Sequence, residues 1–244
     1  MASNPTISKE FAPAGKLRAA LNMGNPVLAR YCATSGLPAG VSVDLSKELG
    51  NTLGVDVDFV CFATAAESVD AVLAQEADIG FMAIDPKRAD GLHFTPAYLL
   101  IEGSYAVPRN SPIHANDEVD RPGHQVVVGS ASAYDLFLTR HLQHARIDRV
   151  PLSEQVIETM LQDGCTAAAG VRQQLEMLIA HTDDARLLDG GFMVINQASA
   201  ISATRSLEAR QYLDAFIEGM KASGFVAASL ARHGVTGVKI APPA

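Results

Sequence analysis

One arginine stands out because of where the sequence places it. Arg88 follows Asp85, Pro86 and Lys87 directly after an apolar run, and a second core-forming stretch begins soon afterwards. A planar guanidinium binds a carboxylate through two parallel hydrogen bonds. Arg88 is therefore either a solvated loop residue or an anchor for an anionic ligand, and the residues around it leave both interpretations open.

A second candidate for anion binding is the turn Gly129–Ser130–Ala131–Ser132, which lies where an apolar strand meets a helix. Backbone N–H groups at a helix start point outward, and the helix dipole favours an anion there. The alternative for Ser130 and Ser132 is simple helix capping, which can coexist with anion binding. Tyr134, in the first turn of the predicted helix, could either line the same site or pack inside the protein.

Other polar or aromatic side chains follow predicted strands, and each has an ordinary structural alternative. The asparagines suit turn chemistry, the phenylalanine suits core packing, and the arginine suits an exposed helix start. The glutamine lies on a long extended segment and could donate into a cleft. These candidates are Asn22, Asn25, Phe62, Arg172 and Gln197.

Motifs for other chemistry are missing from the sequence. We find no glycine-rich phosphate loop, no zinc signature and no nucleophile elbow, so we expect no cofactor and no metal. The three cysteines are Cys32, Cys61 and Cys165, and none has a metal-type spacing to a histidine. We interpret them as reduced, buried small residues.

Composition limits the function classes. The chain has 244 residues, 48% of them hydrophobic and 19% charged, with a formal net charge of −8. This acidic balance argues against general nucleic-acid binding, which needs a basic face. No run of about 18 apolar residues occurs, so we expect no membrane span. The N-terminus has no apolar leader segment, which predicts a cytoplasmic protein if Met1 is the natural start.

The first hundred residues alternate between predicted strands and helices. A short strand covers Leu17–Leu21, and Val41 and Val43 suggest entry into another strand before a helix that ends at Gly54. Strands at 55–62 and 78–84 enclose a helix at 65–77 whose Val69, Val72 and Leu73 face inward. This order is typical of an α/β sheet of parallel strands.

A second α/β unit follows, and long extended segments near 99–108 and 192–202 bracket it. The C-terminal residues read as helices, with Leu207, Tyr212, Leu213 and Phe216 on one side. We expect both extended segments to cross between two lobes. Lobe one would then comprise 1–106 plus 197–244, and lobe two, 107–196, would be inserted in it. Ligands of such sheets bind beyond the carboxyl ends of strands and in clefts between domains.

Four stretches resemble the type 2 periplasmic binding-protein fold and, within it, the amino-acid-type solute-binding proteins (family 3) of ABC transporters. They are "GVSVDLSKEL", "ADIGFMAIDPKRADGLHFTPAY", "VVVGSASAYDLFL" and "GCTAAAGVRQQLE", in the expected order from about residue 15 to 234. The resemblance implies two lobes, each a mixed sheet flanked by helices, with two crossing strands as the hinge. It also implies that Arg88 binds the ligand carboxylate beside Ala83, and that the turn at 129–132 cradles the same group.

The sequence departs from the family pattern in two places. Ser42 stands where the family usually has an acidic residue. The family's aspartate against the ligand ammonium is also missing, because residues 170–173 read Gly–Val–Arg–Gln and the next carboxylate is Glu176. The sequence thus retains the family's residue for the ligand carboxylate but lacks its partner for the ligand ammonium. This departure indicates either a ligand other than a standard amino acid or another residue that supplies the negative charge.

We therefore expect a solute-binding protein that closes on a small carboxylate-bearing ligand, an amino acid or related organic acid. The resemblance implies a periplasmic monomer that serves a membrane permease of an ABC transporter. Two alternatives stay open. One is a cytoplasmic ligand sensor or stand-alone binding module. The other is an enzyme resembling cyclohexadienyl dehydratase, with Glu102 or Glu176 as general acid.

Overall fold

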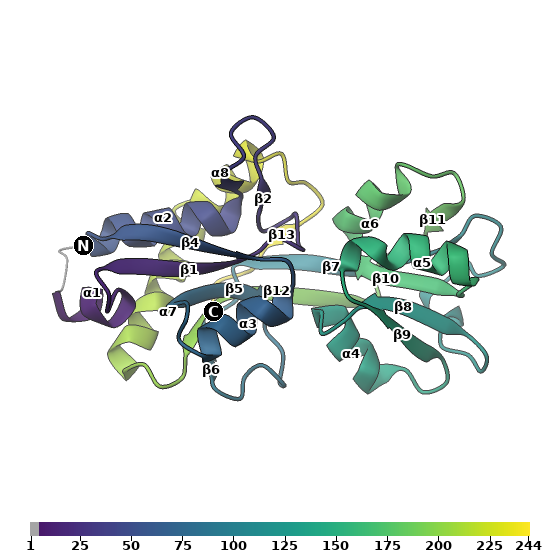
Figure 1. Cartoon of the computed structure of the whole chain (residues 1–244), viewed down its shortest axis with the longest axis horizontal. Helices are drawn as coiled ribbons and strands as arrows, with labels where there is room; N and C mark the ends of the chain where they lie inside the picture. Colours follow the sequence, from purple (N-terminus) through teal and green to yellow (C-terminus); the bar gives the residue numbers. More distant parts are fainter. Residues whose placement is uncertain (1–4) are drawn as a thin grey trace. The chain divides into compact units, whose positions relative to one another are not determined.

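The computed structural model describes residues 5–244, which divide into two compact units (Figure 1). Unit one holds the described residues up to Leu100 together with Asn196–Ala244, and unit two holds Ile101–Ile195. The chain leaves unit one within strand β7 (Leu99–Pro108) and re-enters it within strand β12 (Met193–Ser202). Unit two is therefore an insertion in unit one.

Unit one contains a mixed sheet with the strand order β4–β1–β5–β12. Strand β1 is parallel to both β4 and β5, whereas β12 is antiparallel to β5. Strand β6 pairs with β12 and β13 pairs with β7, while β2 and β3 form a separate two-stranded ribbon. The strand bounds are β1 (Lys16–Asn22), β2 (Arg30–Tyr31), β3 (Pro38–Ala39), β4 (Asp56–Phe62), β5 (Ile79–Ala83), β6 (Leu92–Phe94) and β13 (Lys239–Ile240).

Three helix ends of unit one have caps that the sequence supplies. Thr64 and Glu67 form a capping box at the start of α3, Ser206 caps α7, and Gly54 ends α2 in the left-handed conformation predicted for it. The bounds are α1 (Pro5–Phe11), α2 (Val41–Leu53), α3 (Ala65–Leu73), α7 (Leu207–Ala222) and α8 (Phe225–Arg232).

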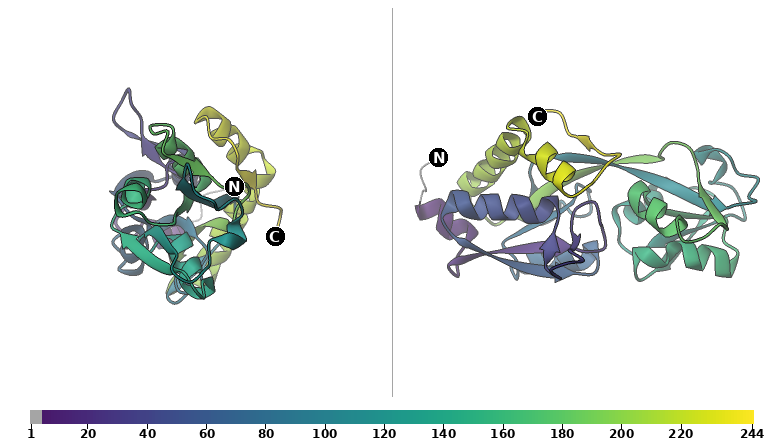
Figure 2. Two further views of the ribbon diagram at one scale, coloured as in Figure 1. Left: turned by 90° about the vertical axis from the view of Figure 1, so that its right-hand side faces the viewer. Right: turned by 90° about the horizontal axis from the view of Figure 1, so that it is seen from above.

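The C-terminal helix α8 packs against α7 and α2 (Figure 2). Asp44 in the first turn of α2 accepts hydrogen bonds from Ser229, Arg232 and His233 at 2.7–2.9 Å. Residues almost two hundred positions apart are thereby joined, so the two chain segments of unit one form one body.

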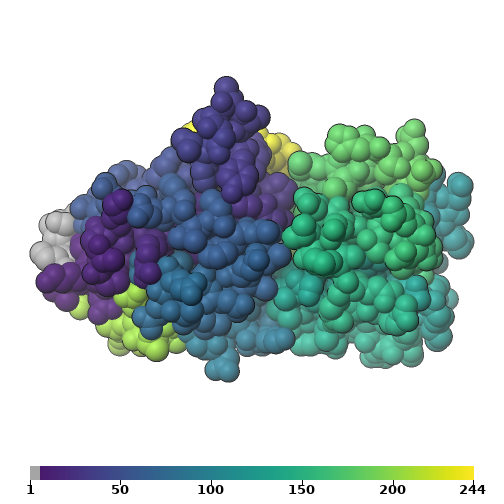
Figure 3. All heavy atoms as spheres, viewed as in Figure 1, coloured from purple at the N-terminus to yellow at the C-terminus, as the bar shows by residue number. Residues whose placement is uncertain are grey.

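The ribbon formed by β2 and β3 belongs to a segment that projects from unit one (Figure 3). Its apolar side chains Tyr31 and Leu37 are exposed. The projecting segment therefore adds little to the core of unit one.

Two details predicted for unit one are wrong, the strand entry at Val41 and Val43 and the inward position of Leu73. Residues 41 and 43 lie in a helix rather than at a strand entry, because α2 begins at Val41 directly after Gly40. Gly40 has φ 137°, and a β-carbon there would lie 2.4 Å from the Leu28 carbonyl oxygen, so only glycine fits this turn. Leu73, predicted to face inward, is 39% exposed because it is the last residue of α3.

The strands of unit two continue the strand order as β7–β10–β8–β9, and β11 also pairs with β7. Strands β8, β9 and β10 are parallel, and β10 is antiparallel to β7. The predicted strand-turn-helix unit near residues 126–133 is confirmed. The bounds are β8 (Gln125–Gly129), α4 (Ala133–His141), β9 (Arg146–Val150), α5 (Val156–Asp163), β10 (Ala167–Val171), α6 (Arg172–Ile179) and β11 (Ala185–Leu187), with short 3₁₀ turns at Asn116–Glu118 and Ser153–Gln155.

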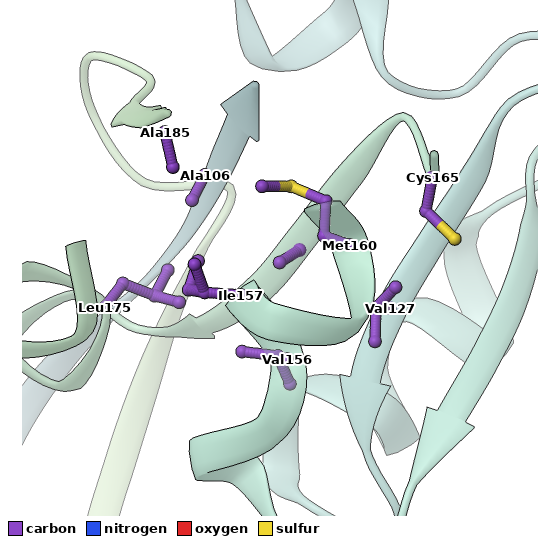
Figure 4. Close-up of a cluster of buried hydrophobic side chains, with 9 residues drawn as sticks. Ala106, Val127, Val156, Ile157, Met160, Cys165, Leu175 and Ala185 are labelled. Atoms are coloured by element: carbon purple, nitrogen blue, oxygen red, sulfur yellow. The ribbon is translucent and has the colours of Figure 1, made fainter. Parts of the chain in front are cut away.

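The core of unit two forms where helix α5 packs on the sheet (Figure 4). Met160 and Ile157 of α5 pack with Val127 of β8 and Leu175 of α6. Strand β10 contributes only the small side chain of Ala168 to this cluster, which leaves room for the helices to approach closely. The packing fixes the carboxyl ends of β8 and β10, where the candidate residues of this unit lie.

No helix among residues 5–244 combines the length and the apolar composition that crossing a bilayer requires. The three cysteines are free thiols; Cys165 is buried, whereas Cys32 and Cys61 are only half-buried, so the prediction of burial holds for one of them.

Candidate functional site

Arg88 lies in a turn that folds back onto the end of strand β5. Its backbone N–H donates to the carbonyl of Asp85 at 3.0 Å, and Nη1 donates to the carbonyl of Ala83 at 3.3 Å. Arg88 is only 5% exposed to solvent. Burial lowers the pKa of Arg88, and the negative charge of Asp85 acts in the opposite direction. Arg88 is thus a buried cation and not the solvated loop residue of the alternative interpretation.

Three strand ends of unit one, with one residue inside β12, place candidate residues at the same edge of the sheet. Asn22 pairs with Phe62 at the carboxyl ends of β1 and β4. Ala83, at the carboxyl end of β5, lies opposite Gln197 of the antiparallel strand β12. Because β1, β4 and β5 are parallel, these residues and Arg88 gather at one edge, where ligands of α/β sheets bind.

The loops after β1 and β4 contact each other at this edge. Asn22 Oδ1 accepts from the Gly24 amide at 3.0 Å, and Asn25 Oδ1 accepts from the Val27 amide at 3.2 Å. A β-carbon on Gly24 would lie 2.4 Å from the Ala63 carbonyl oxygen. Both asparagine oxygens therefore shape the turn, as the structural alternative for these residues predicts.

Gln197 has an unusual environment for a polar side chain. The residue is 3% exposed, and its Oε1 accepts no hydrogen bond from any described residue. Its backbone carbonyl accepts from the Tyr98 amide at 2.8 Å, which holds β12 in register. An unsatisfied buried acceptor costs about 1–3 kcal/mol, so this amide is set up to receive a donor.

In unit two, the amides of the turn after β8 donate to acceptors of the protein itself. The Ser130 amide donates to the Val150 carbonyl at 2.9 Å, and the Ser132 amide donates to the Gly129 carbonyl at 3.2 Å. Ala131 has a left-handed φ of 54°, and its amide donates to Asp135 Oδ2 at 2.8 Å. The N-terminus of α4 therefore already holds a carboxylate of the chain.

Asp135 was not among the residues predicted for the site. It is buried, its amide donates to Ser132 Oγ at 3.0 Å, and its carboxylate accepts from Arg149 Nε at 3.0 and 3.1 Å. The spacing Ser132-x-x-Asp135 resembles a capping box, and this pattern in the sequence could have identified Asp135 as a residue of the helix start. The pairing with Arg149 depends on β9 lying beside β8, which the local sequence does not reveal.

Tyr134 packs inside unit two. Its hydroxyl donates to Ser153 Oγ at 2.6 Å, and burial raises the pKa of the phenol. A β-carbon on Gly129 would lie 2.2 Å from the same Ser153 oxygen. These contacts give Tyr134 the structural role that the sequence left as its alternative.

Arg172, at the start of α6, is tied down by its own unit. Nε donates to Glu102 Oε2 at 2.8 Å, Nη2 donates to the Gly190 carbonyl at 3.0 Å, and Nη1 lies 3.7 Å from Glu176 Oε1. It is therefore neither an ordinary exposed arginine nor a cation without a counter-charge. Since β8 and β10 are parallel neighbours, Arg172 and the 130–132 turn lie at the same edge of this sheet.

The candidate residues thus form two sets, one in each unit. The set in unit one comprises Asn22, Asn25, Phe62, Ala83, Arg88 and Gln197. The set in unit two comprises Ser130, Ala131, Ser132, Tyr134 and Arg172. Within residues 5–244, no three histidine, cysteine, aspartate or glutamate side chains are grouped so as to hold a metal ion.

Sequence comparison identifies one family. Residues 17–235 match the family described as bacterial extracellular solute-binding proteins, family 3, so the match spans most of the chain. No curated protein sequence matches the chain at a significant level.

Solved structures share the fold at low sequence identity. A putative binding component of an ABC transporter from Wolinella succinogenes, complexed with lysine, is 17% identical over 89% of this chain and 95% of that chain, with a TM-score of 0.76. An amino acid ABC transporter substrate-binding protein from Streptococcus pneumoniae, bound to L-arginine, is 17% identical over 92% and 97%, with a TM-score of 0.78. A histidine kinase sensor domain with similarity to periplasmic binding proteins is 16% identical over 93% and 98%, also at 0.78. These likenesses confirm the predicted fold class.

Proposed function

Because the chain belongs to the bacterial extracellular solute-binding proteins of family 3, we propose that it binds a small carboxylate-bearing solute, an amino acid or a related organic acid. In this proposal it is a periplasmic monomer, the receptor of an ABC-type importer, and it delivers the solute to a membrane permease. The lysine-bound and arginine-bound proteins of the same fold support this ligand class.

The observation that carries the proposal is the buried guanidinium of Arg88 at the carboxyl end of β5. Burial opposes its charge and lowers its pKa. A carboxylate placed against it would stabilise the charged form, and the planar guanidinium matches two carboxylate oxygens. A buried arginine contributes little to the solubility of a protein, so we assign Arg88 to the binding of an anion.

Arg88 is not sufficient by itself. A hydrogen bond to a charged group contributes about 1.5–3 kcal/mol, whereas micromolar binding needs about 8 kcal/mol. Asn22, Phe62 and Gln197 at the same sheet edge supply further contacts in this proposal. The chain passes between the units at Leu100–Ile101 and at Ile195–Asn196, and we assign the hinge to these crossings.

A thermal-shift screen followed by calorimetry tests the proposal. The panel contains amino acids, dicarboxylates, keto acids and aromatic acids. A true ligand at 100 times its Kd stabilises the fold by about 2.7 kcal/mol. We expect Arg88→Ala to weaken binding of the best ligand by at least about tenfold, since it removes a charge-assisted contact.

The matched control is Lys16→Ala, which removes an exposed cation at the amino end of β1, away from the candidate edge. This variant should bind as the wild type does. The proposal is wrong if no carboxylate in the panel binds saturably, or if Arg88→Ala retains full affinity.

A ligand sensor is the second candidate, because a histidine kinase sensor domain shares this fold. Sensor and transport receptor both bind the solute without converting it. Deleting the gene in its host separates them, because a receptor's loss abolishes high-affinity uptake of the solute and a sensor's loss leaves uptake intact.

A dehydratase reaction has less support from the geometry. Of the two candidate acids, Glu102 forms an ion pair with Arg172 at 2.8 Å, and Glu176 lies 3.7 Å from the same guanidinium. Both carboxylates are thereby engaged with an arginine of their own unit, which is a structural role. Product formation from a carboxylic acid would nevertheless revive this candidate.

A further inference from the structure

A neutral hydrogen-bond acceptor lies near Arg88 in unit one. Gln197 is more than nine-tenths buried, and its Oε1 has no donor among the described residues. Buried amide oxygens are nearly always hydrogen-bonded, because an unsatisfied one destabilises the fold. This acceptor therefore indicates a donor that arrives with a ligand.

Strand register places the acceptor and the cation around one residue. Gln197 of β12 lies directly opposite Ala83 of β5, and directly opposite residues of an antiparallel pair present their side chains on the same face. The carbonyl of Ala83 accepts from Arg88 Nη1 at 3.3 Å. Arg88 and Gln197 are thus both linked to Ala83, one by a hydrogen bond and the other by strand pairing, and our inference places the ligand carboxylate and its neighbouring group beside this residue.

The charge of the acceptor limits what it can select. An amide oxygen is neutral, so it accepts a hydrogen bond from a hydroxyl as readily as from an amine, and it gives no ion-pair advantage to an ammonium. In the turn that carries Arg88, the Asp85 carboxylate accepts a hydrogen bond from the Lys87 amide at 2.9 Å and so has a role in that turn.

We propose that Gln197 recognises a hydrogen-bond donor adjacent to the ligand carboxylate, so that the solutes of this site are 2-hydroxy and 2-amino carboxylates, and 2-oxo and unsubstituted acids are rejected. This inference rests on the proposed function, since it assumes that Arg88 binds the carboxylate. Rejection follows because a ligand without the donor leaves the buried oxygen unpaired, and such sites discriminate strongly against the analogue that lacks the group.

Matched ligand series test the inference by isothermal titration calorimetry. One series is L-lactate, L-alanine, pyruvate and propanoate. A second is L-3-phenyllactate, L-phenylalanine, phenylpyruvate and 3-phenylpropanoate, and a third has the 2-hydroxyglutarate skeleton with its amino, oxo and unsubstituted forms. We expect the hydroxy and amino members of the series that binds to be at least about tenfold tighter than the other two members.

Two variants assign the selectivity to Gln197. Gln197→Met keeps the length of the side chain and removes the acceptor, so the preference for donor-bearing acids should fall below about threefold. The ligand-free melting temperature should stay the same or rise, because removing an unpaired buried acceptor is neutral or stabilising. Gln197→Glu adds a negative charge and should shift the preference towards the amino acid over the hydroxy acid by at least about tenfold.

The outcomes separate this inference from the proposed function. Equal binding of the 2-oxo or unsubstituted acid by the wild type, or selectivity that persists in Gln197→Met, overturns the role of Gln197 while the binding function stands. A lower ligand-free melting temperature with unchanged selectivity shows a purely structural role and has the same consequence. If no series binds, or if Arg88→Ala binds as tightly as the wild type, the proposed function fails first and this inference with it.

Discussion

Arg88 in unit one and Arg172 in unit two both follow a buried strand of a mixed sheet, yet their surroundings differ. Arg172 is held by the carboxylate of Glu102 at 2.8 Å and by the Gly190 carbonyl at 3.0 Å. Arg88 bonds the Ala83 carbonyl at 3.3 Å, and burial lowers its pKa. The same residue type thus forms a partly exposed ion pair in one unit and lies buried in a turn in the other.

The acceptors of the two units show the same contrast. In unit two, Asp135 satisfies Arg149 and the Ala131 amide at the start of α4. In unit one, Gln197 Oε1 is buried without a donor among the described residues. The acceptor of unit two is thus satisfied by the protein itself, whereas the amide oxygen of unit one is the group that our inference assigns to a ligand.

The largest effect on stability is expected for Asp135→Ala in unit two. The substitution removes a buried carboxylate with several partners and leaves the turn before α4 without its cap, so the free energy of unfolding should fall by about 2–3 kcal/mol. Urea denaturation measures it. Gln197→Met in unit one is the comparison and should cost nothing. A loss under about 0.5 kcal/mol for Asp135→Ala would contradict the anchoring role.

Arg172→Ala should have a smaller effect, on stability and not on binding. The ion pair with Glu102 is partly exposed, so we expect a loss of about 1 kcal/mol in the free energy of unfolding. Affinity for the ligand found in the screen should change less than about threefold, against at least about tenfold for Arg88→Ala. Calorimetry measures the affinity of both variants. A larger loss of affinity for Arg172→Ala than for Arg88→Ala would show that Arg172, and not Arg88, binds the ligand.

Acid should destabilise unit two through Asp120. Burial raises the pKa of this carboxyl, but hydrogen bonds from the Ala145, Gln143 and His144 amides outweigh burial and lower it overall. A lowered folded-state pKa contributes stability above the ordinary value of about 3.9 that is lost as the pH falls through the folded pKa.

Denaturation followed from pH 7 down to pH 2 measures this dependence. Asp120→Asn should unfold with a weaker pH dependence below about pH 4 than the wild type. Identical acid profiles for the two proteins would show that these three hydrogen bonds do not stabilise unit two.

The smallest expected effect is a difference in thiol reactivity between one cysteine of each unit. Hydrogen bonds from Ser35, the largest cause, and from Thr34 lower the pKa of Cys32 to about 7. Burial raises the pKa of Cys165. Brief iodoacetamide treatment at pH 7.5 should therefore label Cys32 well before Cys165, because the thiolate is the reactive form. Peptide mass spectrometry measures the order, and equal or faster labelling of Cys165 would contradict the difference between the two thiols.

Sequence patterns predicted the strands and helices well where local signals were strong. The helix end at Gly54 and the strand-turn-helix at 126–133 needed only local caps and apolar runs. The apparent strand at Val41 and Val43 failed because two alternating residues cannot define a period, and the turn at Gly40 starts a helix instead. The functions of the individual candidate residues were harder to predict, since Tyr134 and Arg172 depend on partners distant in sequence.

By itself, the sequence determined the α/β class, the family pattern and the position of Arg88 after a buried strand, because apolar periodicity and caps act over a few residues. Only the tertiary structure decided which polar groups are already satisfied. Glu102 reaches Arg172 across 70 positions, and Gln197 meets Ala83 only through strand pairing. Hydrogen-bond satisfaction depends on distances of about 3 Å between segments far apart in the chain, and such distances exist only once the sheets have formed.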